Sequence, residues 1–198
     1  MSQARIVAHF QSSLSALTEA AHDDALLRTA CAIAETAVAA LKAGRKLLLA
    51  GNGGSAADAQ HLAAEIVGRY KIDRSGFAAI ALTTDTSALT AIANDYGFAD
   101  VFARQVQALG QRGDVFWGFS TSGTSPNVIA ALKTARAQGL VTVGFTGARG
   151  GAMAASCDTL LMAPTADTPV VQQIHMMAGH AICDAIEHAM VAAGNATR

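Results

Sequence analysis

Two side chains with the chemistry of a proton-transfer pair, His61 and Glu65, lie four residues apart in a segment that predicts a helix. Side chains at positions i and i+4 project from one helix face, about 6 Å from each other at their roots. An imidazole and a carboxylate placed in this way can exchange protons or hold a divalent ion together. Directly before them, Gly51-Asn52-Gly53-Gly54-Ser55 follows the apolar run 47–50. This order predicts a buried strand, an anion-binding turn and a helix with Ser55 as its N-cap.

A second segment whose side chains could bind a ligand covers residues 119–127 and contains five hydroxyl side chains. Ser125 as N-cap and Pro126 at the first helical position predict a helix start whose free N–H groups and dipole favour an anion. The segment contains no lysine or arginine, so it would bind a phosphate through directed hydrogen bonds more than through net charge. We interpret it as a phosphate loop, and the alternative is an ordinary loop rich in serine and threonine.

The glycine turn permits a different interpretation, because residues 51–56 also satisfy the G-x-G-x-x-A form of the dinucleotide-binding fingerprint. Such a protein needs an acid after the next strand, and Asp85 could serve. A dinucleotide requires neither the His61 and Glu65 pair nor a second phosphate-type loop. A Walker A loop is excluded, since no Lys-Ser or Lys-Thr follows the glycines.

Near the C-terminus, Thr168-Pro169 predicts the start of a mostly apolar helix that carries Gln172, His175 and His180. One polar residue on such a helix is more often a satisfied core group than a ligand, and we expect His175 to be structural. Gln172 and His180, together with the first pair, would make a nitrogen and oxygen set suited to Zn²⁺ or a similar ion. Because these two residues are about 12 Å apart along a continuous helix, either both side chains splay inward or subunits share the site.

Composition limits the classes of partner. The 198 residues carry a net charge of -1 and only 15% charged residues, so we expect neither nucleic acid nor a membrane as a partner. Three widely spaced cysteines without a C-x-x-C motif indicate a reducing, cytoplasmic compartment. A hydrophobic content of 52% and a mean hydropathy of +0.32 are high for a soluble monomer, so we expect oligomer interfaces.

Apolar runs predict five strands, at residues 46–50, 77–82, 115–120, 141–146 and 159–163, and helical patterns separate most of them. This alternation predicts an α/β fold with a doubly wound five-stranded parallel sheet, flavodoxin-like and flanked by helices, that binds ligands at the carboxyl ends of its strands. We expect a single domain over residues 1–198. Within it, N-terminal helices in 1–44 would serve oligomerisation and 45–195 would form the α/β core.

Several of these residues recur together in one known family. They are Gly51–Ser55, Asp58–His61, Glu65, Arg69, Ala93–Asp95, Ser120–Gly123, Gln172 and His180. On these residues the chain resembles the sugar isomerase (SIS) domain family, and within it the phosphoheptose isomerases. The resemblance implies a homotetramer that interconverts sedoheptulose 7-phosphate and D-glycero-D-manno-heptose 7-phosphate, the first step toward the ADP-heptose of lipopolysaccharide. It also implies one zinc ion per subunit, with ligands His61, Glu65, Gln172 and His180.

Isomerising a ketose to an aldose moves a proton between adjacent carbons through an enediol, which requires a base and an acid. We expect Glu65 to be the base and His180 the acid. The resemblance suggests that Arg69 reaches a neighbouring site. We expect sugar hydroxyls to be held by Asn52, Gly53, Asn94 and Asp95, and the phosphate by Ser120, Thr121, Ser122 and Ser125. The other expected substrate contacts are Gly54, Ser55, Glu65 and Gln172.

Two alternatives to the isomerase remain. One is a non-catalytic SIS protein that binds the bacterial replication initiator, which shares the glycine loop and much of the phosphate loop. That relative lacks the acid and histidine that stand here as Glu65 and His180, so their presence favours an enzyme. The other is a dinucleotide-binding enzyme.

Overall fold

The computed structural model describes residues 2–194 and is built around a five-stranded parallel sheet with the strand order β2-β1-β3-β4-β5. The predicted fold class is therefore confirmed. The expected core boundary at residue 195 lies outside the described residues. The strands are β1 Leu47–Gly51, β2 Ala79–Ala81, β3 Val115–Phe119, β4 Val141–Thr146 and β5 Thr159–Met162. Strand β2 is shorter than the apolar run that predicted it, because only three of its residues pair with β1.

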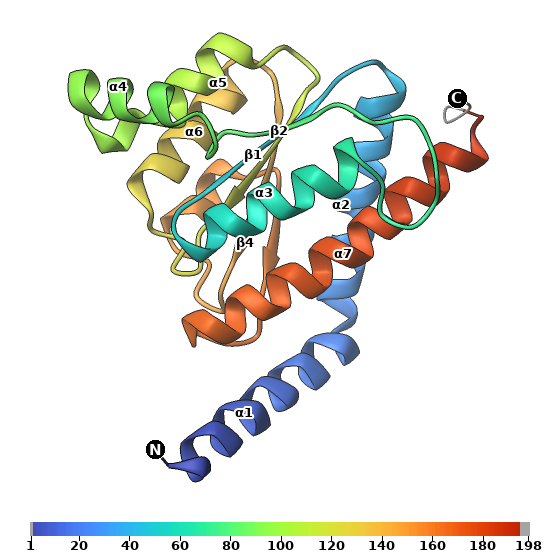
Figure 1. Ribbon diagram of the computed structural model, residues 1–198, viewed down its shortest axis with the longest axis vertical. Helices are drawn as coiled ribbons and strands as arrows, with labels where there is room; N and C mark the ends of the chain where they lie inside the picture. The colour runs from blue at the N-terminus through green and yellow to red at the C-terminus, as the bar shows by residue number, and fades with distance from the viewer. Residues whose placement is uncertain (1, 195–198) are drawn as a thin grey trace.

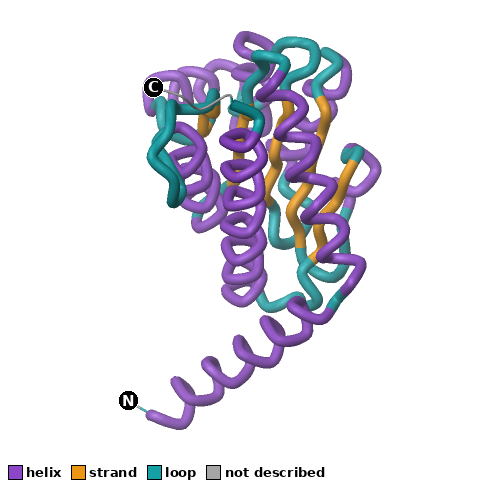
Figure 2. Tube along the Cα trace, turned by 90° about the vertical axis from the view of Figure 1, so that its right-hand side faces the viewer, coloured by secondary structure: helices purple, strands orange, loops and turns teal. Residues whose placement is uncertain are grey.

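Helices cover both faces of the sheet (Figure 1; Figure 2). They are α1 Gln3–His22, α2 Asp24–Lys42, α3 Gly54–Val67, α4 Thr86–Tyr96, α5 Ala103–Leu109, α6 Pro126–Ala137 and α7 Thr168–Ala192, with short 3-10 turns η1 Phe98–Asp100 and η2 Ala152–Ser156. Alternate strand residues point to opposite faces. Leu47 and Leu49 pack in one apolar cluster with α2, α3 and α7, whereas Leu48 packs in a second cluster with α5 and α6. Because every residue of β1 is buried, an unbroken apolar run was its correct signature.

The first helix differs from the others in how little of it is buried. Figure 1 shows α1 extending away from the sheet at the N-terminal end of the chain. Only Ser13, Ala16 and Ala20 of this helix are buried, while Phe10 and Leu14 are 71% and 67% exposed. Helix α2, in contrast, contributes Ile33 to the core cluster on the sheet. Among the described helices, none combines the length and apolar character needed to cross a membrane.

The strand order creates a crevice at the centre of the sheet. From β1 the chain moves first to β2 on one side and then returns to place β3 on the other side. Ligands of open α/β sheets bind at such a switch point, outside the carboxyl ends of the strands. The last residues of β1 and β3, Gly51 and Phe119, are partners in the strand register. The two loops singled out in the sequence therefore leave the sheet side by side.

Candidate active site

The glycine turn after β1 brings the chain directly into α3. Helix α3 begins at Gly54, and its N-cap residue is Gly53, whose φ of 57° lies in the left-handed region that favours glycine. The prediction of Ser55 as N-cap was wrong, because this backbone conformation starts the helix earlier and leaves Ser55 buried in its first turn. A Cβ atom on Gly51 would lie 2.6 Å from the carbonyl oxygen of Ser55, so the turn also needs glycine at that position.

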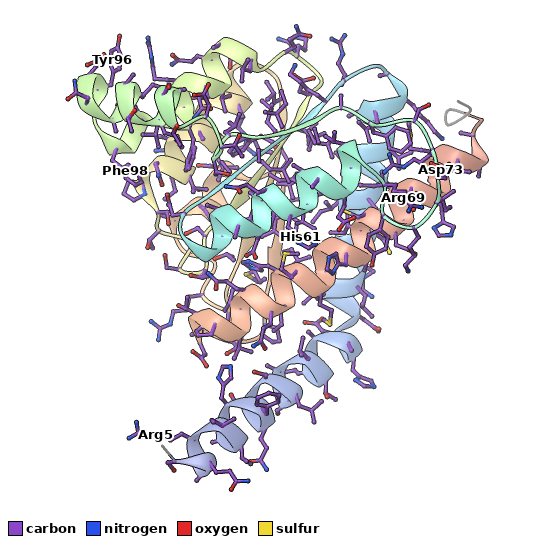
Figure 3. All side chains as sticks on the ribbon, viewed as in Figure 1. Arg5, His61, Arg69, Asp73, Tyr96 and Phe98 are labelled. Carbon is purple, nitrogen blue, oxygen red and sulfur yellow. The ribbon has the colours of Figure 1, made fainter. Side chains whose placement is uncertain are left out.

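Helices α3 and α7 form the walls of the site and bring three of the predicted residues together. The Nε2 atom of His61 lies 3.2 Å from a carboxylate oxygen of Glu65, as the i,i+4 spacing predicted, and 3.0 Å from the Nε2 atom of His180. The side chain of His61 is 50% exposed and that of Glu65 is 23% exposed, so the cluster is open to a ligand. Figure 3 shows His61 on the side of α3 that faces α7.

Close packing of the two helices explains why these histidines meet. Gly179 allows α7 to approach α3, since a Cβ at that position would lie 2.6 Å from a methyl group of Leu62. The residues next to this contact are His61 on α3 and His180 on α7. A contact between a small residue and a leucine therefore sets the two imidazoles opposite each other.

The three side chains can hold a divalent ion. One ligand atom from each of His61, Glu65 and His180 lies within 4.8 Å of the others. Two imidazole nitrogens and a carboxylate oxygen are a donor set that suits zinc and related ions, and a catalytic site of three protein ligands keeps a position open for substrate.

Gln172 lies further along α7, at the glycine turn. Its side-chain amide rests against Gly54, where an added Cβ would come within 2.7 Å of the amide carbon. Gln172 therefore faces the start of α3, and its role as a metal ligand stays a prediction.

His175, which shares α7 with Gln172 and His180, is structural as expected. It is fully buried, and its Nε2 atom lies 3.2 Å from the carbonyl oxygen of Thr146. Burial lowers the pKa of His175 to about 4, against the opposing effect of this hydrogen bond.

The hydroxyl-rich loop after β3 is preorganised by bonds between its own side chains. Ser125 is the N-cap residue of α6 and Pro126 follows it, as predicted, but the Ser125 hydroxyl does not cap the helix. It is instead 2.8 Å from the hydroxyl oxygen of Ser120, and the hydroxyls of Ser122 and Thr124 are likewise 2.8 Å apart. Pro126 has no N–H and the N–H of Val128 is bound by the Asn127 side chain, so the loop would hold an anion chiefly through its hydroxyl groups.

A cavity of about 490 Å³ opens beside this loop. Thr121, Ser122, Thr124, Arg149 and Thr168 are among the residues that line it. Sequence reasoning missed Arg149, although its position shortly after β4, at the carboxyl edge of the sheet, was a usable signal. The cavity therefore combines hydroxyl donors with a guanidinium group, which together suit a phosphate.

A pair of amides joins the glycine turn to the phosphate loop. Asn52 donates to the side-chain oxygen of Asn127 at 2.8 Å, and Asn127 donates back to that of Asn52 at the same distance. Asn127 also accepts a hydrogen bond from the Val128 N–H. Asn127 lies in the hydroxyl-rich segment 119–127, but nothing in that motif indicated its structural role.

Two further residues, Asp58 and Tyr70, lie close to the two histidines of the cluster. Asp58 on α3 is buried, one of its carboxylate oxygens has no hydrogen-bond partner among the described residues, and burial raises its pKa to about 6 against the opposing charge of His61. Tyr70 lies against His180 with the ring centroids 5.6 Å apart. No pattern in the sequence indicated this aromatic contact.

Three residues predicted to bind substrate lie outside the cluster of His61, Glu65 and His180. Asn94 and Asp95 are exposed on α4, which packs against the opposite face of the sheet from α3, and they bond to each other at 2.8 Å. Arg69 is exposed on the loop after α3 (Figure 3). Their contacts with substrate stay predictions. Asp85, the acid of the dinucleotide interpretation, caps α4 by accepting from the Ala88 N–H.

The doubly wound sheet, the hydroxyl-rich loop at its switch point and the adjacent acid–histidine cluster define a SIS-domain protein. Residues 8–147 match the family model described as SIS domain. A phosphoheptose isomerase from Bradyrhizobium sp. (strain BTAi1 / ATCC BAA-1182) is 61% identical over 94% of each chain. A phosphoheptose isomerase structure from Neisseria gonorrhoeae shares 47% identity, covering 94% of this chain and 98% of that one, with a TM-score of 0.88. One from Francisella tularensis shares 34% identity, covering 95% and 99%, with a TM-score of 0.91. This chain therefore belongs to the phosphoheptose isomerase family.

Proposed function

We propose that this protein isomerises sedoheptulose 7-phosphate to D-glycero-D-manno-heptose 7-phosphate, and so supplies a precursor of ADP-heptose for lipopolysaccharide. The observation that carries the proposal is the meeting of Glu65 with His61 and His180 in a chain 61% identical to a relative named phosphoheptose isomerase. The initiator-binding alternative needs no such pair of proton-transfer groups. The comparisons likewise favour the isomerase over a dinucleotide enzyme.

The side chains account for each proton in the reaction. Glu65 removes a proton from carbon 1 of the ketose while His180 donates one to the carbonyl oxygen on carbon 2, which forms the enediol. His180 then takes the hydroxyl proton from the oxygen on carbon 1, and Glu65 delivers a proton to carbon 2, either the one that it removed or one exchanged with solvent. The aldose is formed, and both residues regain their starting protonation states.

The phosphate end of the substrate would bind at the switch point. Hydroxyls of the loop after β3 would donate to the phosphate oxygens, and Arg149, which lines the same cavity, would add positive charge. The loop residues assigned to this role are Ser120, Thr121, Ser122 and Ser125.

We assign one zinc ion per subunit to His61, Glu65 and His180, with Gln172 as the fourth proposed ligand. His180 would hold the ion through one ring nitrogen and transfer protons at the other. A bound zinc would supply Lewis-acid polarisation of the two substrate oxygens. The three clustered ligand atoms support this assignment.

We propose that the protein works in the cytoplasm as a homotetramer with active sites between subunits. The exposed apolar side chains of α1, among them Phe10 and Leu14, support an interface on this helix. Gln172 and His180 are about 12 Å apart along α7, which favours a site shared between subunits, with Arg69 reaching a neighbouring one. The three cysteines are free thiols, as expected in a reducing compartment.

Turnover by variants of the two proposed catalytic residues tests this function. Aldose formation from sedoheptulose 7-phosphate would be measured with and without a chelator for wild type, Glu65→Gln and His180→Ala. Each variant should lose at least about 10²-fold in kcat, because positioned proton transfer typically contributes that much. His188→Ala is the matched control, since His188 lies exposed on the same helix two turns further on. Wild-type turnover by both folded variants would refute the assigned roles.

A further inference from the structure

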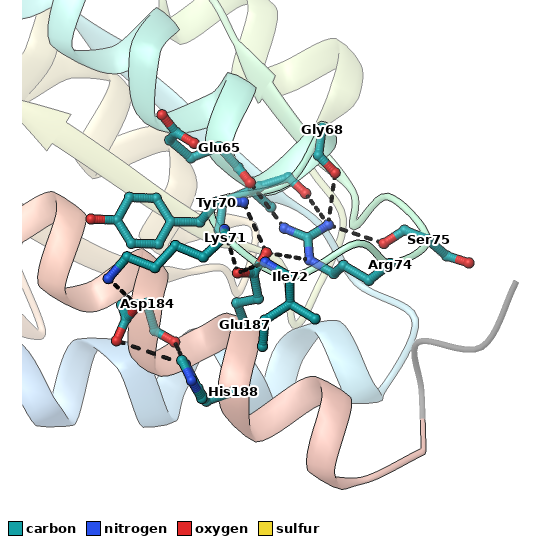
Figure 4. A network of polar contacts seen from close by, with 11 residues as sticks. Glu65, Gly68, Tyr70, Lys71, Ile72, Arg74, Ser75, Asp184, Glu187 and His188 are labelled. Carbon is teal, nitrogen blue, oxygen red and sulfur yellow. Dashed lines mark hydrogen bonds and ion pairs between the residues drawn. The ribbon is translucent and has the colours of Figure 1, made fainter.

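A buried ion pair lies next to the proposed acid and base but takes no part in the mechanism above. Glu187 on α7 is fully buried, and its carboxylate accepts hydrogen bonds from the backbone N–H groups of Tyr70, Lys71 and Ile72 at 2.6 to 2.8 Å. It also accepts from Nε of Arg74 at 2.9 Å (Figure 4). Burial raises the pKa of Glu187, but these hydrogen bonds outweigh that effect and the net pKa is lowered. One carboxylate therefore fixes the loop that follows α3.

Arg74 connects this carboxylate to the end of the helix that carries the base. Its guanidinium group donates to the carbonyl oxygen of Glu65 at 2.9 Å and to that of Ile66 at 3.0 Å. It also donates to the carbonyl oxygens of Gly68 and Ser75. Carbonyl groups at a helix C-terminus lack intrahelical partners, and a cation there is favoured by the helix dipole. Arg74 thus caps α3 at the residue proposed as the base.

The same loop holds Tyr70 against the proposed acid. The Tyr70 ring lies 5.6 Å from the His180 ring at a tilt of 31°, and the His61 ring lies 5.0 Å from the His180 ring at 63°. His180 is therefore in contact with a ring on each of two neighbouring segments, which restricts the rotation of its imidazole. Lys71 strengthens this arrangement by an ion pair with Asp184 at 2.9 Å and by its position 4.8 Å from the Tyr70 ring.

Two features argue for a role beyond stability. Replacing a buried ion pair by apolar groups of similar size is often neutral or stabilising, so net stability alone does not account for this pair. His180 and Glu187 are seven residues apart on α7, or about 10 Å, and the loop spans the distance between them.

We propose that Arg74 and Glu187 are positioning residues, which hold Glu65 through its backbone and His180 through the ring of Tyr70. This inference deepens the proposed isomerase function and rests on it. Tyr70 acts by packing, so its ring matters and its hydroxyl does not. Glu187 acts on His180 through Tyr70, so the two residues should be coupled.

A double-mutant cycle tests the proposal. The variants are Tyr70→Leu, Tyr70→Phe, Glu187→Gln and the combination of Tyr70→Leu with Glu187→Gln. For each, kcat and KM with sedoheptulose 7-phosphate, zinc affinity by calorimetry and the melting temperature would be measured. Tyr70→Phe, which keeps the ring, is the matched control.

The proposal predicts that Tyr70→Leu lowers kcat and zinc affinity by about tenfold each, the loss typical of an outer-shell partner, with KM changed less than about twofold. Tyr70→Phe should stay within about twofold of wild type in all three quantities. The double variant should lose no more kcat than Glu187→Gln alone, because residues that act through one another are not additive. Losses that multiply in the double variant, or a Tyr70→Leu variant with wild-type kcat and zinc affinity, would overturn the proposal.

The cycle separates this inference from the function on which it rests. If wild type does not isomerise the heptulose phosphate, the proposed function fails, and the zinc affinities of the two Tyr70 variants still decide the positioning role. If Glu187→Gln does not fold, the same two Tyr70 variants decide it. A folded wild type that neither turns over nor binds zinc overturns both proposals.

Discussion

Replacing His175 by glutamine should change how the stability of the protein depends on pH. His175 is fully buried on α7, with its ring 6.1 Å from that of Phe119 and 5.9 Å from that of Phe145. Burial lowers its pKa from 6.5 to about 4, so the folded protein keeps this imidazole neutral where the unfolded chain protonates it. Glutamine does not titrate, and its amide can still donate to the carbonyl oxygen of Thr146.

The sign and size of the effect follow from linkage. Between pH 6.5 and pH 4 the unfolded chain binds more protons at this site than the folded protein, so stability from His175 is complete above pH 6.5 and is lost as pH falls toward 4. Each pKa unit corresponds to about 1.4 kcal/mol, so wild type should lose about 2.5 kcal/mol between pH 7.5 and pH 4.5 through this residue alone. His175→Gln should therefore be less destabilised by acid than wild type by this amount.

Denaturant unfolding of wild type and His175→Gln across this pH range measures the difference. The control is His9→Gln, which removes an exposed imidazole on α1 and should give a curve parallel to wild type. If the His175→Gln and wild-type curves are also parallel, the imidazole is not held neutral by burial. The assignment of His175 as the structural histidine of α7 would then be wrong.

Three further predictions concern the residues around the site. Asp58→Asn should raise the free energy of unfolding at pH 7.5 by up to roughly 3 kcal/mol and by progressively less toward pH 4. The reason is that burial disfavours the ionised form of Asp58 and raises its pKa from 3.8 to about 6. A pH-independent difference in denaturant unfolding would contradict this. Asn127→Ala should lower the free energy of unfolding by about 2 kcal/mol, at about 1 kcal/mol for each of its two hydrogen bonds with Asn52, and should raise KM. An unchanged melting temperature and KM would show that the amide pair does not hold the two loops together. Gly123→Ala should raise KM at least about tenfold, because the phosphate loop must move to accept the new side chain. Gly123 has a φ of 67°, and an added Cβ would meet the backbone of Gly150. A wild-type KM would refute this reasoning.

The fold was largely predictable because its strands carry a clear signal. Fully buried parallel strands produce unbroken apolar runs such as Leu47–Ala50, and β4 has the predicted bounds. The i,i+4 pairing of His61 with Glu65 follows from helix geometry alone. The prediction of Ser55 as N-cap failed because the residue type of Ser55 does not reveal that Gly53, two residues earlier, has a positive φ and starts the helix.

Contacts between distant segments could not be predicted in the same way. The approach of His180 to His61 depends on Gly179 meeting Leu62, and no local pattern specifies which glycine faces which leucine. Arg74 and Glu187 are 113 residues apart, and both are buried. From the sequence alone, each would be predicted to be an ordinary exposed charge. Such pairs are determined by tertiary packing, which one sequence does not display.

The proposed isomerase mechanism is tested most directly by incubating zinc-loaded protein with sedoheptulose 7-phosphate in D2O and recording NMR spectra of the product. If Glu65 and His180 transfer protons through an enediol and the proton on Glu65 exchanges with solvent, the aldose should appear with solvent deuterium at carbon 2, and folded Glu65→Gln should form almost none. Failure of the folded, zinc-loaded wild type to form any aldose would contradict the account.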